Sequence, residues 1–262
     1  MADAFYERGD GEGRYVATEL TRGPWDPGSQ HAGPPSALLG REIEAIEGSD
    51  DLQVGRVVFE ILRPVPIGPV QVETRVLRPG RKVRMVEASL SGEAGELMRA
   101  TAWQLRSTEL ELPEGAVDDA PPPPGPDEGW VPEFFPTGQE VGYHTGMELR
   151  AVAGGFLELG PATCWLRMRQ PLVADEESTP LQRALVAADV GNGISAVLDY
   201  RSYVFINVDL TVHFERMPVG EWVCIDAVTR PQPTGIGTAE SVLSDERGRL
   251  GRAAQSLLIE QR

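Results

Sequence analysis

Apolar and polar residues alternate along much of the chain, in short runs that Gly and Pro interrupt. Examples are VQVETRVL from residue 70, WVCIDAVT from residue 222 and AESVLS from residue 239. A period of two residues is the pattern of antiparallel strands that bury one face. The sequence therefore predicts a largely antiparallel sheet.

Two segments have a helical period instead. The first is predicted over residues 36–47 and ends at Gly48, and the second begins at Pro180 with Thr179 as its N-cap. Each segment has one apolar face, formed by Leu38, Leu39, Ile43 and Ile46 in the first and by Leu181, Ala184, Leu185 and Ala188 in the second. Each helix precedes a group of strands, which predicts an α+β chain.

The order of turns and strands in residues 63–105 occurs again in residues 215–259. Both segments begin with a Pro-Gly turn, continue through a strand to an Arg-Pro break, and end with two strands joined by an acidic Gly turn. The matching positions are Pro66 and Pro218, Gly68 and Gly220, Arg78 and Arg230, Pro79 and Pro231, Glu87 and Glu240, Gly95 and Gly248, and Arg99 and Arg252. The chain is therefore predicted to contain one helix-and-sheet unit twice.

Residues 112–139 are dense in Pro, Gly and acidic residues, and separate the two copies. Such a composition predicts an extended connector. We expect an N-terminal repeat over residues 1–111, a Pro-rich linker over 112–139 and a C-terminal repeat over 140–262.

Composition narrows the classes of partner. Hydrophobic residues make up 41% of the chain, enough for a large core, and the formal net charge is −16. That charge repels phosphate backbones and anionic headgroups, so neither a nucleic acid nor a membrane is an expected partner. The first residues are acidic and polar, unlike a secretory signal, and a cytoplasmic location is expected.

The residues that commonly bind metals are scattered. Cys164 and Cys224 are far apart in apolar runs, and free buried thiols are the expected state. His31, His144 and His213 form no ligand spacing with them, so no metal site is predicted.

Four segments resemble a known family: WDPGSQHAGPPSALL from residue 25, AADVGNG from residue 187, FINVDLTVHFERMPVGEWV from residue 205 and GRAAQSLLIE from residue 251. The chain is similar over nearly its whole length to tandem double-hotdog proteins of the acyl-CoA thioesterase II type, within the broader thioesterase-like superfamily. The resemblance implies two hotdog units, each a curved antiparallel sheet around one helix. It also implies hydrolysis of an acyl-CoA to the free acid and coenzyme A, without a cofactor, by a homo-oligomer.

The resemblance also implies particular site residues. The family's catalytic Asp falls on Asp189 and its Gln on Gln255. The position of its small hydroxyl residue falls on Asn207, which departs from the pattern but can hold a water through its carboxamide. The segment from His31 through Ala32 to Gly33 resembles a turn that begins a helix, where free N–H groups can stabilise an oxyanion. Gly33 is the expected donor, because Pro34 and Pro35 have no N–H, and His31 and Ala32 are expected to contact substrate.

The internal repeat gives evidence for the site that does not depend on the family resemblance. Matching the copies sets Gln255 against Ala102, Asn207 against Gly55, and Asp189 near Ala37. A residue that only maintains the fold tends to recur in both copies, and these three polar residues do not. One composite site is therefore predicted at the boundary between the repeats.

Asp209 is a lesser candidate, because it lies two residues after Asn207 on the same strand face. The basic residues Arg78, Arg81, Lys82 and Arg84 are expected on a solvated strand face, or alternatively against the phosphates of coenzyme A. The sequence does not separate direct attack by water from an acyl-enzyme route through Asp189.

Two other functions stay open. One is a hotdog enoyl-CoA hydratase or dehydratase, which needs an imidazole paired with a carboxylate. Among the histidines, only His31 at the opposite helix start could meet Asp189. The other is a non-catalytic acyl-CoA-binding protein, for which the departure at Asn207 is the reason.

Overall fold

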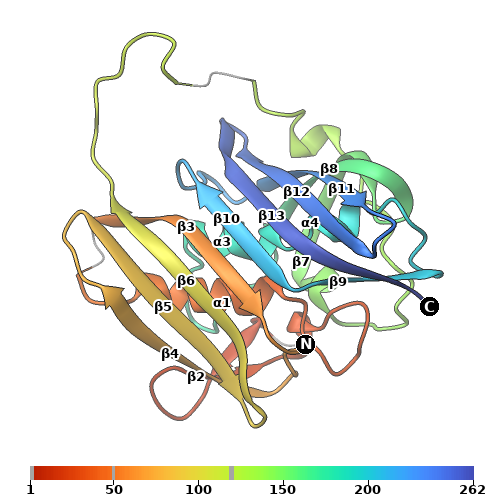
Figure 1. Ribbon diagram of the computed structural model, residues 1–262, viewed down its shortest axis with the longest axis horizontal. Coiled ribbons are helices and arrows are strands. Elements are labelled where there is room, and N and C mark those ends of the chain that lie inside the picture. Colours follow the sequence, from red (N-terminus) through yellow and green to blue (C-terminus); the bar gives the residue numbers. More distant parts are fainter. Residues whose placement is uncertain (1–2, 49–50, 118–120) are drawn as a thin grey trace.

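The computed structural model describes residues 3–48, 51–117 and 121–262. Within them, thirteen antiparallel strands form one curved sheet in the order β1-β2-β4-β5-β6-β3-β10-β13-β12-β11-β8-β7, with β9 paired to β13 (Figure 1). The strands are β1 Tyr6–Arg8, β2 Arg14–Ala17, β3 Leu52–Ile61, β4 Pro69–Arg78, β5 Val83–Gly92, β6 Gly95–Arg106, β7 Met147–Gly155, β8 Glu158–Met168, β9 Tyr203–Asn207, β10 Asp209–Phe214, β11 Val223–Pro231, β12 Ile236–Asp245 and β13 Gly248–Gln261. The predicted antiparallel α+β class is confirmed.

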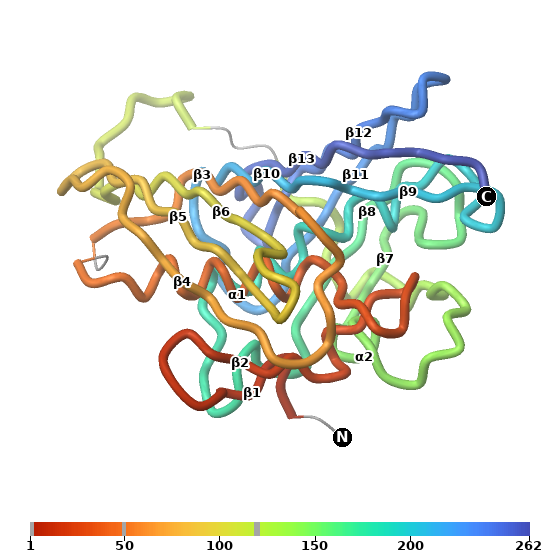
Figure 2. Tube along the Cα trace, turned by 60° about the horizontal axis from the view of Figure 1, so that its bottom comes forward, coloured from red at the N-terminus to blue at the C-terminus, as the bar shows by residue number. Residues whose placement is uncertain are grey.

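Two longer helices, α1 Gly33–Glu44 and α3 Pro180–Ala188, pack against each other on the inner face of the sheet. In Figure 2 the strands lie above α1 and curve around it. Short helices are α2 Tyr143–Gly146 and α4 Gly191–Ile194, with 3-10 turns at Glu19–Thr21 and Pro126–Glu128. The core therefore lies between this helix pair and the sheet.

Helix α1 begins and ends three residues earlier than predicted. Pro34 and Pro35 occupy its first turn, where an N–H has no partner within the helix, so they start the helix rather than precede it. The first bond within the helix runs from Ser36 N–H to the carbonyl of Ala32. Thr179 is the N-cap of α3 as predicted, and its hydroxyl accepts from Gln182 N–H.

The two helices are antiparallel and unusually close. A side chain at Gly40 would collide with Leu185, and one at Gly33 would collide with the carbonyl of Val186. At the other end of the pair, the Thr179 hydroxyl donates to Glu44 Oε2 at 2.7 Å. The start of each helix therefore lies at the end of the other.

The two copies meet where β3 pairs with β10, at a register that includes Val58 opposite Thr211. Val86 pairs with Ala102 in the first copy and Ala239 pairs with Gln255 in the second, so Gln255 does correspond to Ala102.

The sheet register corrects two other predicted matches. Asn207 pairs with Leu257, and the corresponding pair is Val54 with Gln104, so Asn207 matches Val54 rather than Gly55. Asp189 is the C-cap of α3, the position that Ala45 holds in α1, and not a match for mid-helical Ala37. The match of Asp189 fails because the segments between helix and sheet differ in length.

The predicted linker consists of two unlike parts. Residues 112–117 of the linker, together with residues 107–111 before it, are exposed and arch away from the body in Figure 1. Trp130, in contrast, pairs with Ala151, and Phe135 is buried. The later part of the linker is thus packed onto the second copy, while the proposed domain boundaries stay a prediction.

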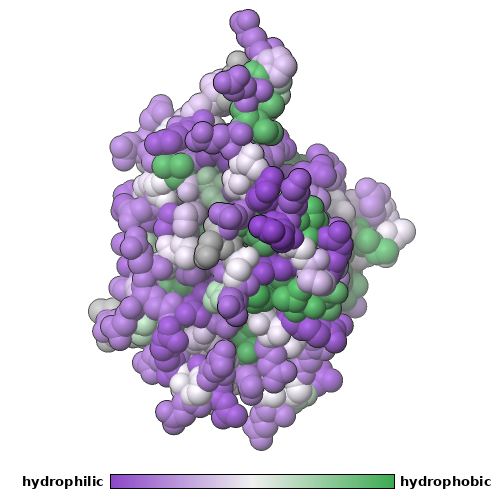
Figure 3. All heavy atoms as spheres, turned by 90° about the vertical axis from the view of Figure 1, so that its left-hand side faces the viewer, coloured by the Kyte–Doolittle hydropathy of each residue, from purple (hydrophilic) through white to green (hydrophobic). Residues whose placement is uncertain are grey.

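The face in Figure 3 is mostly hydrophilic, as expected for a chain with a net charge of −16. No helix in the described part of the chain is long and apolar enough to cross a bilayer. Cys164 and Cys224 are free and buried, as predicted.

Candidate active site

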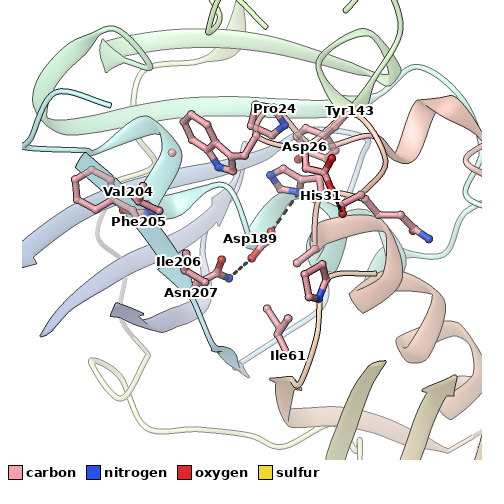
Figure 4. A pocket seen from close by; sticks show the side chains of 18 of the residues that line it. Pro24, Asp26, His31, Ile61, Tyr143, Asp189, Val204, Phe205, Ile206 and Asn207 are labelled. Atoms are coloured by element: carbon pink, nitrogen blue, oxygen red, sulfur yellow. Dashed lines mark hydrogen bonds and ion pairs between the residues drawn. The ribbon is translucent and has the colours of Figure 1, made fainter. Parts of the chain in front are cut away.

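A cavity of about 610 Å³ lies at the boundary between the two copies. The first copy contributes the turn before α1 and the end of β3, and the second contributes the end of α3 and strand β9 (Figure 4). Its lining is mostly apolar and includes His31, Ala32, Asp189, Asn207 and Gln255. Five of the six predicted site residues therefore line one cavity, while Gly33 lies beside it and is absent from the lining.

Asp189 lies at the centre of this cavity, with 7% of its surface exposed. Its Oδ1 accepts hydrogen bonds from Asn207 Nδ2 at 2.8 Å and from Gln255 Nε2 at 2.9 Å. Burial raises the pKa of Asp189 to about 7, although the amides of Asn207 and Gln255 and the backbone N–H groups of Ala32 and Gly33 favour the ionised form. The carboxyl group can therefore both hold and release a proton near neutral pH.

The carboxamide of Gln255 is fixed in one orientation. Its Oε1 accepts the Asn192 N–H at 3.1 Å, which turns Nε2 toward Asp189. Nε2 then donates to Asp189 Oδ1 and also to the Asp189 carbonyl at 3.1 Å. Gln255 is 4% exposed, so water does not compete for these bonds.

His31 meets the other carboxylate oxygen. Its Nδ1 lies 3.2 Å from Asp189 Oδ2 and 3.1 Å from the N–H nitrogen of Gly33. Burial lowers the pKa of His31 to about 3, so the imidazole is neutral. When Asp189 is ionised, the favourable tautomer carries its proton on Nδ1 and donates it to Oδ2. When Asp189 is protonated, Nδ1 can accept instead, from the carboxyl group or from Gly33.

Tyr143 holds the imidazole in place and was not predicted. Its ring stacks on His31 with centroids 3.9 Å apart and planes 5° apart. Its hydroxyl donates to the carbonyl of Val186 at 2.9 Å, which ties it to the last turn of α3. Burial and the Asp189 charge raise the pKa of Tyr143. Its role arises from packing across the two copies, which no local motif records.

Gly33 is placed at the start of α1 as predicted, but its N–H is directed at the meeting point of His31 and Asp189. Its proposed role toward an oxyanion stays a prediction. Asp209 lies outside the cavity, and its Oδ1 accepts the Ser256 N–H.

The four basic residues of the sequence analysis also lie outside the cavity lining. Arg78 donates to the carbonyl of Val83. Arg84, expected on a solvated face, is only 7% exposed and donates to Gln104 Oε1 and to the carbonyl of Glu47. It binds the end of α1, because the last carbonyls of a helix lack partners within the helix.

The sequence analysis also missed the aromatic wall of the cavity, formed by Trp25, Phe134, Phe135 and Phe156. These residues come from the turn before α1, the linker and the β7–β8 hairpin. One signal was present, since two adjacent Phe residues are unusual in an acidic, Pro-rich connector.

Comparison with known proteins agrees with this fold. A protein from Thermobifida fusca YX, provisionally described as a thioesterase II, is 20% identical to this chain, with 98% of this chain and 96% of that chain covered and a TM-score of 0.76. A tesB protein from Mycobacterium avium subs paratuberculosis is 17% identical over 97% of this chain and 95% of that one, with a TM-score of 0.66. A protein from Alicyclobacillus acidocaldarius described as having a hot dog fold is 14% identical over 96% and 94%, also with a TM-score of 0.66.

These likenesses place the chain in the hot dog fold class. Residues 21–105 match the family model of the acyl-CoA thioesterase N-terminal domain, and residues 117–259 match that of the C-terminal domain. The chain therefore belongs to the acyl-CoA thioesterase family. No curated protein sequence matches it significantly.

Proposed function

We propose that this protein hydrolyses acyl-CoA thioesters, with Asp189 as the residue that activates water. The observation that carries the proposal is the buried Asp189 carboxylate, held by Gln255 and Asn207 inside an apolar cavity at the boundary of the two copies. Two amide donors hold one carboxylate oxygen, and the turn before α1 approaches the other. Membership of the acyl-CoA thioesterase family supports the same chemistry.

In the proposed reaction, the oxygen of a water bound at Asp189 attacks the thioester carbonyl carbon. Asp189 takes the proton of that water, and the carbonyl oxygen becomes the oxyanion of a tetrahedral intermediate. The C–S bond then breaks, the free acid forms, and coenzyme A leaves as its thiolate. Asp189 then gives its proton to that thiolate or to solvent, which restores the carboxylate. A general base works best when its pKa lies near the working pH, which the raised pKa of Asp189 provides.

Gly33 takes the oxyanion role in this mechanism. While Asp189 is ionised, the Gly33 N–H points toward its carboxylate. Proton transfer from water neutralises Asp189 and moves the negative charge to the substrate oxygen. The Gly33 N–H is a fixed donor at the start of α1, so it stabilises the oxyanion when the thioester oxygen lies beside Asp189 and within reach of this N–H.

The proposal also covers the architecture, the substrate, the location and the assembly of the protein. We describe the architecture as a double hotdog, because one helix and one half of the sheet recur in each copy. Acyl-CoA is the proposed substrate, cytoplasm the proposed location and a homo-oligomer the proposed assembly.

The test is a thiol-release assay over a panel of acyl-CoAs, with the wild type, Asp189→Asn and the control Asp226→Asn. Asp226 is an exposed Asp on β11, away from the cavity. The proposal expects release by the wild type and the control, and loss of release with Asp189→Asn. Tight acyl-CoA binding without thiol release would instead identify a non-catalytic binding protein.

One observation favours a second candidate, an enoyl-CoA hydratase or dehydratase. That chemistry needs an imidazole beside a carboxylate, and His31 Nδ1 lies 3.2 Å from Asp189 Oδ2. Loss of enoyl absorbance on adding the protein to an enoyl-CoA, without thiol release, would support it. Thiol release equal to the loss of enoyl absorbance would exclude it, because cleavage of the thioester also removes that absorbance.

A further inference from the structure

The cavity continues from Asp189 along strand β9. Figure 4 shows Asn207 and Ile206 near Asp189, with Phe205 and Val204 farther along the same strand. The lining also includes Tyr203, at the other end of β9, and Arg262 beyond the end of β13. At about 3.3 Å per residue, the strand from Asn207 to Tyr203 spans about 13 Å. We name this part of the cavity the β9 arm.

The wall of the β9 arm is aromatic. Trp25 contacts Phe135 with ring centroids 4.9 Å apart, and Phe135 contacts Phe156 at 5.4 Å. Trp25 is 52% exposed, although it is a large apolar side chain beside a cavity. Phe135 and Trp25 also contact Tyr200, whose carbonyl accepts from Arg262 Nε. The wall therefore runs from the reaction centre to an exposed arginine.

The arm opens directly beside the reaction centre, at Gly193. Its neighbour Asn192 donates its backbone N–H to Gln255, which contacts Asp189. A Cβ at position 193 would lie 3.7 Å from the Phe156 ring, an ordinary contact distance, and would meet no backbone. A larger side chain here would stand between Asp189 and the aromatic wall.

We propose that the β9 arm binds the acyl chain and selects straight chains of up to about ten to twelve carbons. This inference rests on the proposed thioesterase function and adds its substrate range. An extended chain advances about 1.1 Å per bond, as a strand does with three bonds in about 3.3 Å, so about 13 Å corresponds to about twelve bonds. Beyond that length a methyl group would reach Arg262 and water, and would gain no burial.

The other part of the substrate that could lie in this arm is the pantetheine of coenzyme A. Pantetheine carries two amides, which need hydrogen-bond partners when they leave water. The rings of Trp25, Phe135 and Phe156 offer an apolar surface, which suits an alkyl chain better. All acyl-CoAs share the same pantetheine, so the dependence on chain length separates the two occupants.

The experiment measures kcat/KM for straight-chain acyl-CoAs from acetyl to hexadecanoyl. For the wild type we expect a rise of up to about fourfold per methylene, which ends at ten to twelve carbons. Gly193→Leu should lower the ratio of decanoyl-CoA to acetyl-CoA cleavage at least thirtyfold. Arg262→Leu, at an exposed terminal position, should raise the ratio of tetradecanoyl-CoA to decanoyl-CoA cleavage about three- to tenfold. The control Ala254→Leu, on the exposed face of β13, should change neither ratio.

Two results would overturn the inference while leaving the thioesterase function in place. One is thiol release with no dependence on chain length, and the other is an unchanged decanoyl-to-acetyl ratio in Gly193→Leu together with an unchanged ratio in Arg262→Leu. A wild type that releases no thiol from any acyl-CoA would instead contradict the proposed function itself.

Discussion

The two ends of the helix pair share one backbone plan but differ in chemistry. We call the end at Asp189 the active corner and the end at Glu44 the opposite corner. Gln255 donates to the carbonyl of Asp189, and Gln104 similarly donates to the carbonyl of Ile43. A glutamine from the last strand of each copy thus satisfies a carbonyl at the end of that copy's helix.

The difference lies in what surrounds each glutamine. At the opposite corner the guanidinium of Arg84 donates to Gln104 and to the end of α1, and a smaller cavity of about 330 Å³ lies nearby. In the second copy the position that matches Arg84 is Gly237, since Arg84 pairs with Gln104 and Gly237 pairs with Leu257. The side chain of Ile259 packs against Gly237, so the second copy has no guanidinium at this position.

We expect the largest effect from replacing the carboxyl group at each corner, Asp189 or Glu44. Asp189→Asn should lower kcat/KM for acyl-CoA cleavage about 10³-fold, because the amide cannot accept the proton of water. Glu44→Gln, at the opposite corner, should change it less than about twofold. Steady-state thiol release measures both. Equal losses in the two variants would contradict a single active corner.

The free energy of unfolding should depend on pH through the buried Asp189 at the active corner. The pKa of Asp189 is raised from 3.8 to about 7 in the folded protein, so the folded state keeps a proton that the unfolded state loses. The contribution of Asp189 to stability is therefore complete below about pH 4 and is lost as the pH rises to about 7.

Relative to the wild type, Asp189→Asn should gain about 2–4 kcal/mol of unfolding free energy between pH 5 and pH 8. Urea unfolding of both proteins at the two pH values measures this difference. Glu44 is present in both proteins, so its own raised pKa cancels. A difference that does not vary with pH would show that Asp189 is not buried as a titrating group.

The two glutamines should separate function from stability. Gln255→Leu removes the Nε2 donor to Asp189 and should lower kcat/KM about thirtyfold. Gln104→Leu leaves the Arg84 guanidinium without its Oε1 acceptor and should cost about 1–3 kcal/mol of stability, with activity within about threefold. Thiol release and urea unfolding distinguish these outcomes, and a reversed pattern would contradict the comparison.

The smallest effect concerns Asn207. Asn207→Val introduces the residue that matches it at the opposite corner and removes one donor to Asp189, so kcat/KM should fall about tenfold. Asn207→Thr keeps a hydroxyl donor and should stay within about threefold of the wild type. If both substitutions lowered kcat/KM equally, the carboxamide itself would be required.

The fold and the residues around Asp189 could be predicted from the sequence because both follow from local sequence patterns. Alternation predicts strands, and a polar residue present in only one copy stands out in a repeat. Tyr143 leaves no such trace, because its position beside His31 depends on contacts between the two copies. The adjacent Phe residues of the linker are a weak trace, which does not show that Phe135 reaches the cavity. The match of Asp189 to Ala37 was wrong because the segments that connect each helix to the sheet differ in length, and an alignment with a constant offset does not allow for this.

The pairing of β3 with β10 has a consequence for how the protein could be divided. The two copies are held together by a strand ladder and by the contact between α1 and α3, whereas residues 107–117 are exposed. A cut within that exposed segment would leave each fragment with its own share of the interface. Co-expressed fragments should then reassemble as a split enzyme, in which neither piece alone carries a complete set of reacting groups.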